Sequence, residues 1–293
     1  MRSIEEHLAR EPANSALKPD QQLLFHYTTF AGFLGIVSGR SMWASSIHYL
    51  NDSQEFKHGL DVAKGVAQRK IPDENGARRQ LLERFITALQ QYSRGYLYVA
   101  SFTEKGDLLS QWRGYAATGG LSLGFDFGVL RDVAERNTFR LIKCIYDNET
   151  KQRIATEIVD SALNGMPSDI EFDASQIEKS AYALVLSYFQ LAAAFKDSSF
   201  TEESEWRLIS RYIPMNHHRV RVRATPRMLI PYYDLPLDLG RTKMERKDIG
   251  LELIVVGPSS EQDLISEAVG IATHGQGLWV KSQQYSRIPY RTL

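Results

Sequence analysis

The chain has 293 residues, of which 43% are hydrophobic and 24% are charged, and this composition is typical of a globular protein with a sizeable core. Lysine and arginine together number 35, as do aspartate and glutamate, so the formal net charge is zero. A zero net charge argues against binding of long nucleic acid by bulk electrostatics, although it leaves room for a local basic patch.

The cysteine content and the N-terminal segment give expectations about the compartment. The one cysteine, Cys144, cannot form an internal disulfide, and no group of Cys and His has the spacing of a zinc site. The polar N-terminal segment has the features of neither a signal peptide nor an anchor. No apolar run approaches the roughly 18 residues of a membrane-spanning helix. We therefore expect a cytoplasmic protein of bacterial type, with no metal and no membrane partner.

The first half of the chain contains both strands and helices. Residues 1–20 are predicted to form a short helix and a loop that ends at Pro19. Residues 22–29, rich in aromatic and β-branched side chains, predict a strand, and residues 30–39 predict a helix with Gly39 at its C-cap. Extended segments are then expected at 41–46, 96–104, 119–126 and 139–147, with helices up to about residue 70, over about 74–93, and near 107–116.

The second half begins with a predicted helical insert at 149–197, interrupted near 164–169 and apolar on a broad face in its second part. Strands dominate both ends of the chain and helices lie between them, so we predict an α+β fold in a single domain, residues 1–293. Strands are expected at 205–212, 220–225, 227–237, 251–258 and 277–291, with a capped helix at 259–275.

The first candidate motif is the sequence HYT at the end of the first strand. His26 is followed by Tyr27 and the hydroxyl of Thr28, and strand ends are where folds of this class present reactive side chains. The alternative is that His26 and Tyr27 simply pack at a strand edge, because a lone histidine is often structural.

The second motif is YLND, near the start of the next helix. Tyr49 offers a stacking face and a hydroxyl, which suit a nucleotide ring. Asn51 and Asp52 equally form a natural turn and helix cap, together with Ser53.

The third motif is SFT on the strand 96–104, followed by QWR. Ser101 lies on one face of the strand and Phe102 on the other. Arg113 could clamp a phosphate or carboxylate through two hydrogen bonds. Alternatively, Trp112 belongs to the core and Arg113 to the surface.

The fourth motif is the sequence EESEWR before a late strand. Glu202, Glu203 and Glu205 lie within four positions, and burying such charges is costly unless they are paired. Glu203 and Glu205 would share one face of an extended chain and could divide the roles of stabilising a cation and orienting a nucleophile. Arg207 could pair with these carboxylates. The alternative is a solvated turn.

The order of these motifs resembles that of the ADP-ribosyltransferase superfamily. The resemblance implies a mixed, mainly antiparallel split sheet with a cleft that binds NAD as a substrate. It implies that Glu205 stabilises the oxocarbenium ion formed when the nicotinamide–ribose bond breaks, that Glu203 orients the acceptor, and that His26 holds the ribose. The residues that we place at the NAD site are His26, Tyr27, Thr28, Tyr49, Ser101, Phe102, Trp112, Arg113 and Arg207.

A second resemblance covers residues 22 to 291. The series HYT, YLNDSQEF, SFTEKGDLLSQWRGYA, GLSLGFD, EESEWRLI and IVVGP looks like a bacterial family known only as a domain of unknown function. Members of that family are suspected of roles in phage defence or in toxin-like systems. This resemblance carries no activity with it.

Two other functions compete with NAD cleavage. A metal-dependent nuclease would bind Mg²⁺ through Asp52, Asp107, Glu203 and Glu205. The basic segment 211–227 would then contact phosphates, although its alternating Arg219, Arg221 and Arg223 also suit a solvated edge strand. A non-catalytic sensor would bind a nucleotide or a partner protein in the same pocket. The acceptor of an ADP-ribose group could be a protein, a nucleic acid, a small molecule or water, and a regulatory partner is possible.

Overall fold

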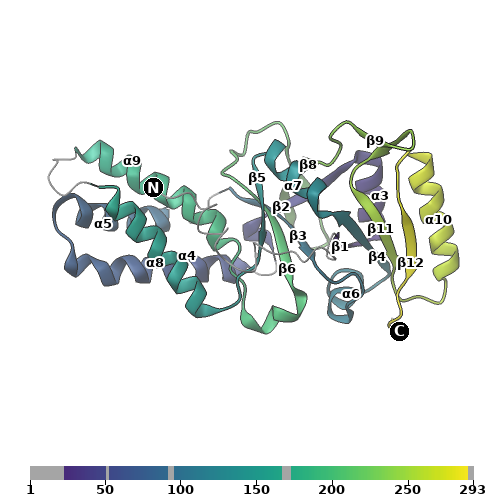
Figure 1. The fold of residues 1–293 in the computed structure, drawn as a ribbon, viewed down its shortest axis with the longest axis horizontal. Helices are drawn as coiled ribbons and strands as arrows, with labels where there is room; N and C mark the ends of the chain where they lie inside the picture. Colours follow the sequence, from purple (N-terminus) through teal and green to yellow (C-terminus); the bar gives the residue numbers. More distant parts are fainter. Residues whose placement is uncertain (1–22, 51–52, 92–95, 167–172, 290–293) are drawn as a thin grey trace.

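The structure is a computed structural model that describes residues 23–50, 53–91, 96–166 and 173–289. The predicted helix and loop at 1–20 and the turn at Asn51 and Asp52 lie outside these residues. The described chain has a sheet-rich part and a helix-rich part, which lie next to each other along the longest axis (Figure 1).

Ten strands form one large sheet, and a further two strands form a separate small sheet. The large sheet follows the order β12–β11–β4–β1–β3–β2–β8–β7. Two more strands belong to it outside this order: β6 pairs with β3, and β5 pairs with β6. Each pairing in it is antiparallel except that of β11 with β12. The strands are β1 (Leu23–Thr29), β2 (Ser41–Ser46), β3 (Tyr98–Thr103), β4 (Gly120–Asp126), β5 (Phe139–Lys143), β6 (Glu205–Ser210), β7 (Val220–Ala224), β8 (Leu229–Pro236), β11 (Leu251–Val256) and β12 (Ser282–Tyr285), with β9 (Arg241–Lys243) and β10 (Arg246–Asp248) in the small sheet.

The sheet opens beside β3. One edge of β3 pairs with β6 from Val99 to Thr103. The other edge is shared, because β1 meets it at Thr103 whereas β2 meets it at Tyr98 and Val99. A strand has only two hydrogen-bonding edges, so β1 and β2 must diverge on the same side of β3. This divergence leaves a gap beside the middle of β3.

Four helices pack together at the other end of the molecule (Figure 1). The predicted insert 149–197 corresponds to two of them, of which the second packs against both helices that come earlier in the chain and the first packs against one of these. The helical part is therefore assembled from two separate stretches of sequence. Its helices are α4 (Ser53–Lys70), α5 (Gly76–Gln91), α8 (Asn148–Asn164) and α9 (Ala174–Ala192), with the short turns η1 (Ile47–Tyr49), η2 (Ile71–Asp73) and η3 (Ser198–Glu203) nearby.

The remaining helices belong to the sheet part. They are α3 (Phe30–Gly39), α6 (Leu109–Tyr115), α7 (Phe127–Arg136) and α10 (Gln262–Gly275). Helix α7 was not among the predicted elements. It starts directly at the end of β4, where the Asp126 carboxylate accepts a hydrogen bond from the amide of Val129 and caps the first turn.

The small sheet of β9 and β10 was not predicted, and the strand expected at 277–291 forms only at Ser282–Tyr285. Two further details differ from the prediction. The left-handed residue that ends α3 is Arg40, with φ of 48°, and not Gly39. The strand expected at 139–147 ends at Lys143, after which Ile145 forms a single bridge to Phe195. The α+β class and the mainly antiparallel sheet are otherwise as predicted. Within the described residues, no helix has both the length and the apolar character needed to cross a membrane.

Candidate functional site

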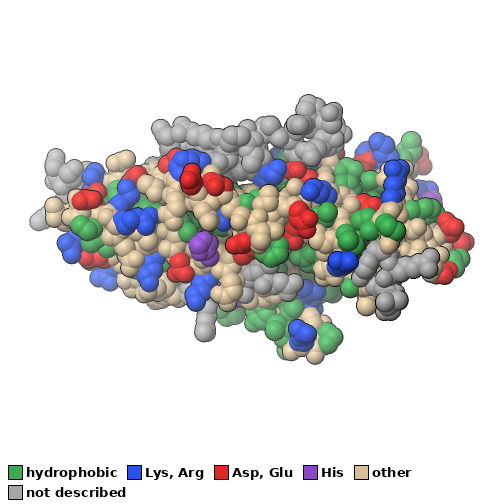
Figure 2. Space-filling view, turned by 90° about the horizontal axis from the view of Figure 1, so that it is seen from below, with side chains coloured by type: hydrophobic (Ala, Val, Ile, Leu, Met, Phe, Trp, Pro, Cys, Tyr) green, Lys and Arg blue, Asp and Glu red, His purple; other side chains and the backbone are tan. Residues whose placement is uncertain are grey.

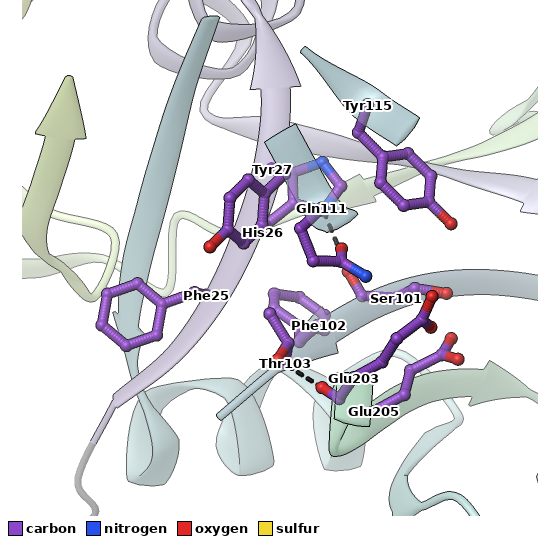
Figure 3. A pocket seen from close by; sticks show the side chains of 10 residues that line it. All are labelled: Phe25, His26, Tyr27, Ser101, Phe102, Thr103, Gln111, Tyr115, Glu203 and Glu205. Atoms are coloured by element: carbon purple, nitrogen blue, oxygen red, sulfur yellow. Dashed lines mark hydrogen bonds between the residues drawn. The ribbon is translucent and has the colours of Figure 1, made fainter. Parts of the chain in front are cut away.

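A small pocket of about 50 Å³ lies where β1, β3 and the start of β6 approach one another. Figure 3 shows the side chains that surround it, with the two carboxylates on one side and the His26 and Tyr27 rings on the other. Because its walls come from segments far apart in the sequence, only the fold brings them together. The lining residues are Phe25, His26, Tyr27, Ser101, Phe102, Thr103, Gln111, Tyr115, Glu203 and Glu205.

A hydrogen bond across the gap in the sheet holds the ring of His26. Its Nδ1 lies 2.9 Å from the carbonyl oxygen of Ser101, on the side of β3 where β1 and β2 diverge. A carbonyl oxygen only accepts hydrogen bonds, so Nδ1 carries the proton and donates it, which leaves Nε2 as an acceptor in the neutral ring. Burial lowers the pKa of His26, and the bond to Ser101 opposes this shift only in part. The imidazole is therefore neutral at neutral pH.

Glu205 is buried at the first position of β6. Its Oε1 accepts a hydrogen bond from Nε of Arg207 at 2.7 Å, and its Oε2 contacts Nη2 of Arg207 at 3.2 Å and Nζ of Lys196 at 2.7 Å. Glu203 reaches the same lysine, with Oε2 3.1 Å from Nζ. Glu203 and Glu205 are therefore held by cations, whereas Glu202 is exposed on the turn before them.

The surroundings of Glu205 keep it ionised. Burial by itself raises its pKa, but the charges of Arg207 and Lys196 and their hydrogen bonds outweigh burial and lower the pKa to about 2. The same burial and the neighbouring charge of Glu205 raise the pKa of the Cys144 thiol well above its usual range. Glu205 is thus a carboxylate at any pH at which the protein is expected to work.

Arg207 extends this group toward the helical part. Its Nη2 lies 3.4 Å from Oε2 of Glu55 in α4, and its Nη1 donates to the carbonyl of Ala193, just after α9, at 2.8 Å. Arg207 is buried, and it lines neither the small pocket nor the larger cavity described next. We refer to Glu55, Lys196, Glu203, Glu205 and Arg207 together as the Glu205 ion-pair cluster.

A larger cavity of about 510 Å³ adjoins the small pocket and shares His26, Tyr27, Ser101 and Tyr115 with it. It lies beside the gap between β1 and β2, with α3 on one side and β7 on the other. Its other lining residues are Thr28, Thr29, Ala31, Gly32, Gly35, Ile36, Ser41, Met42, Trp43, Ser45, Tyr49, Leu50, Val99, Ala100, Arg223 and Ile230.

The structure therefore brings most of the predicted site residues together, but not all of them. Trp112 is buried outside both spaces, with its ring in edge contact with Tyr27 and its Nε1 donating to Asp107. Arg113 lies on the exposed side of α6 and lines neither space. For Trp112 and Arg113, the structure matches the alternative of a core tryptophan and a surface arginine.

Of the residues proposed for a magnesium site, Asp107 lies apart from Glu203 and Glu205. Asp107 accepts hydrogen bonds from Trp112 Nε1, the Ser286 hydroxyl and the Arg287 amide, and it lines neither space with Glu203 and Glu205. Asp52 lies outside the described residues. Among the described residues, no group of three or more His, Cys, Asp or Glu is placed to hold a metal ion.

The basic segment divides into two parts. Strand β7 ends the path of the sheet, and Arg221 is exposed there, as expected for a charged edge strand. Arg223 instead turns toward the larger cavity. On the face in Figure 2, acidic and basic side chains are interspersed, which agrees with the net charge of zero.

The predicted site residues did not include Gln111 and Tyr115 of the small pocket, Arg223 of the larger cavity, or Lys196, which pairs with the pocket carboxylates. Gln111 and Tyr115 lie on α6, four positions apart, and so share the helix face that meets the pocket. That spacing was a usable signal. Lys196 gave none, because it follows an apolar helix at a distance of several residues from the carboxylates that it pairs with.

Comparison with known proteins gives a match to part of the chain and no activity. No curated protein and no solved structure matches the chain. Residues 111–208, about one third of the chain, match a family model described as Protein of unknown function (DUF2971). The matched stretch runs from α6 to β6 and includes Gln111, Glu203 and Glu205 of the small pocket.

Proposed function

We propose that this chain binds NAD at the small pocket and the adjoining cavity and breaks the nicotinamide–ribose bond, either to transfer ADP-ribose to an acceptor or to hydrolyse NAD. One observation carries the proposal: His26 of β1, Ser101 of β3 and Glu203 and Glu205 at the start of β6 line one pocket, at the point where β1 and β2 diverge. This is the arrangement that the resemblance to ADP-ribosyltransferases implies.

The chemistry suits the carboxylates. As the bond breaks, nicotinamide leaves with the bonding electron pair and becomes neutral, and C1′ of the ribose develops a positive charge. An ionised carboxylate beside the ribose stabilises that charge, and Glu205 is held ionised by its cations. The acceptor then forms a bond to C1′ and loses a proton. Glu203, whose side chain is the more exposed of the two, is placed to orient the acceptor and take this proton.

NAD consumption by the purified protein tests the proposal, and the choice of variants matters. Glu205→Gln removes the expected catalytic charge but also leaves Lys196 and Arg207 buried without it, so lost activity alone would not separate catalysis from folding. Glu203→Gln and Ser101→Ala change the pocket at a smaller structural cost. Glu104→Gln is a matched control, because Glu104 pairs with Lys143 at 2.7 Å but does not line the pocket.

We expect Glu203→Gln and Ser101→Ala to reduce NAD turnover by about a hundredfold or less without lowering the unfolding temperature, and Glu104→Gln to leave turnover nearly unchanged. EDTA should not affect the wild type. Turnover that is unaffected by all pocket variants, or that requires a metal ion, would contradict the proposal.

The second candidate is binding of a nucleotide without turnover. It is favoured by the pairing of both Glu205 carboxylate oxygens with cations, which reduces the negative charge available to a substrate. Titration with NAD distinguishes the two functions. Saturable binding with no release of nicotinamide, in the presence of candidate acceptors, would support a sensor.

A further inference from the structure

The larger cavity has a cationic residue at the end opposite the carboxylates. One wall of the cavity is a face of the sheet formed by β2, β8 and β7. Ser45 of β2 pairs with Tyr232 of β8, and Tyr232 pairs with Arg221 of β7, so these three side chains share a face. Side chains two positions away along each strand lie on the same face. Trp43, Ser45 and Arg223 lie on this face and line the cavity. The wall therefore combines an exposed aromatic ring, a hydroxyl and a guanidinium.

Arg223 is held in place by neutral groups only. Its Nη2 donates to the Ser45 hydroxyl at 3.1 Å, and its guanidinium carbon lies 5.6 Å from the centre of the Trp43 ring. Its Nε is buried and has no hydrogen-bond partner, and within the described residues no carboxylate forms an ion pair with it. Burial lowers the pKa of Arg223, which still leaves it a cation near neutral pH.

This situation is unlike that of Arg207, whose charge is balanced by Glu205 and Glu55. A half-buried cation that lacks an anionic partner and keeps an unused donor is a ready binding site for an anion. Two oxygens of a phosphate or carboxylate group match the planar fork of a guanidinium through two parallel hydrogen bonds.

The opposite wall of the cavity also favours an anion. Thr29 caps α3 through its hydroxyl, which accepts from the amide of Gly32, and Thr29, Ala31 and Gly32 all line the cavity. The first turn of α3 has no acidic residue to offset the positive end of the helix dipole. Two independent features of the same cavity thus favour negative charge.

We propose that the larger cavity binds the diphosphate of a nucleoside diphosphate, that Arg223 is the residue that binds it, and that the ligand is the ADP half of NAD; this last identification rests on the proposed function. A cavity of about 510 Å³ is of the size that protein sites use for ligands such as nucleotides. The exposed rings of Tyr49 and Tyr115 on its walls offer stacking faces for a base.

The test is isothermal titration calorimetry with ADP, adenosine and inorganic pyrophosphate. Wild-type protein should bind ADP at least about tenfold more tightly than adenosine, and Arg223→Gln should remove most of this difference while changing adenosine affinity by less than about twofold. Arg221→Gln is the matched control. It removes the same charge from the same strand, but Arg221 is exposed and does not line the cavity.

Three outcomes would contradict the inference. If ADP does not bind, or if Arg223→Gln leaves its affinity unchanged, Arg223 is not a diphosphate ligand. If Arg221→Gln weakens ADP as much as Arg223→Gln, the effect is general electrostatics. If pyrophosphate binds as tightly as ADP, the cavity is a phosphate site and not a nucleotide site. Arg223→Lys, which keeps the charge but not the fork, should weaken ADP by an intermediate amount and guards against misfolding of the glutamine variant.

The inference and the proposed function can fail separately. Binding of ADP that depends on Arg223, without consumption of NAD, would retain the diphosphate site and reject the enzyme. Consumption of NAD with a KM that Arg223→Gln does not change would retain the enzyme and reject the site.

Discussion

At the residue scale, the Glu205 ion-pair cluster raises the question of why the chain buries so many charges. Removing two charges from water costs several kcal/mol for each ion, and the attraction between them offsets this only with good geometry. The geometry here is good, with contacts of 2.7 Å from Glu205 to both Arg207 and Lys196. We therefore expect the cluster to add little net stability, although each member depends strongly on the others.

Replacing Lys196 by methionine should lower the free energy of unfolding by about 3–5 kcal/mol, because Glu203 and Glu205 would remain buried without their shared cation. Urea denaturation measures this change. The control is Lys143→Met, because the Lys143 side chain is 24% exposed against 2% for Lys196, so its loss should be clearly smaller. Equal losses of unfolding free energy in the two variants would show that Lys196 contributes no more to stability than Lys143.

The low pKa of Glu205 also predicts a dependence of stability on pH. The folded pKa of about 2 lies below the ordinary value of 4.5, so the unfolded state binds a proton first, and the stability due to this group is lost as pH falls from about 4.5 to about 2. The loss from this group is on the order of 3 kcal/mol. Unfolding free energies measured from pH 5 to pH 2 should fall less steeply for Glu205→Gln than for the wild type.

At the scale of elements, the crossing of α4 and α9 depends on one glycine. A methyl group added at Gly59 would lie 2.9 to 3.1 Å from the side chain and backbone of Ala192, which cannot rotate away. The carbonyl of Gly59 also accepts a hydrogen bond from the hydroxyl of Tyr188, in α9. The two helices can approach this closely only because position 59 has no side chain.

Gly59→Ala should therefore destabilise the protein by about 1–3 kcal/mol, despite the better helix propensity of alanine. The matched control is Gly65→Ala in the same helix, where the nearest atom is the mobile end of Arg69 at 3.4 Å. That change should be neutral or stabilising by up to about 1 kcal/mol. Thermal unfolding of both variants decides the matter, and a stable Gly59→Ala protein would refute the close crossing.

Most elements could be predicted from the sequence because their signals are local. The strand at Leu23–Thr29 has a dense aromatic and β-branched run, and the helix at Phe30–Gly39 has apolar residues at helical spacing. The pairing partners could not be predicted, because nothing local says that β3 lies between β1 and β6. Helix α7 begins directly at Asp126, the last residue of a strand, as α3 begins at Thr29, yet only α3 was predicted.

The candidate site was predictable in part for the same reason. His26, Ser101 and Glu205 could be chosen because each lies in a recognisable strand. Lys196 and Arg223 could not be chosen, because their importance comes from a neighbour that lies nearby only after folding. The reason given for pairing Glu203 with Glu205 was also wrong in detail. Glu203 ends a 3-10 turn, and the two carboxylates meet through Lys196 and not through an extended chain.

At the scale of the whole molecule, the helical and sheet parts share a core. Val99 of β3, Ile142 of β5 and Ile209 of β6 belong to the same buried cluster as the four packed helices. The contact of Arg207 with Glu55 crosses the same boundary. A core that includes both parts favours one cooperative unit over two separately stable ones.

The chain offers a direct measurement of this cooperativity. Its four tryptophans, Trp43, Trp112, Trp206 and Trp279, all lie outside the four packed helices, so their fluorescence reports on the sheet part. Far-UV circular dichroism reports mainly on helix. We expect the two signals to change at the same urea concentration. Separate midpoints would show that the two parts unfold independently and that the chain is better described as two domains.

The burial of the single cysteine has a practical consequence. Cys144 is buried and its thiol is held protonated, so a maleimide or Ellman's reagent should not react with the folded protein. The native chain therefore behaves toward these reagents as if it had no cysteine. Pairs of cysteines introduced on exposed positions of α5 and α10 could be labelled with fluorophores without first removing Cys144, and energy transfer between them would report directly whether ligands change the distance between the two ends of the molecule.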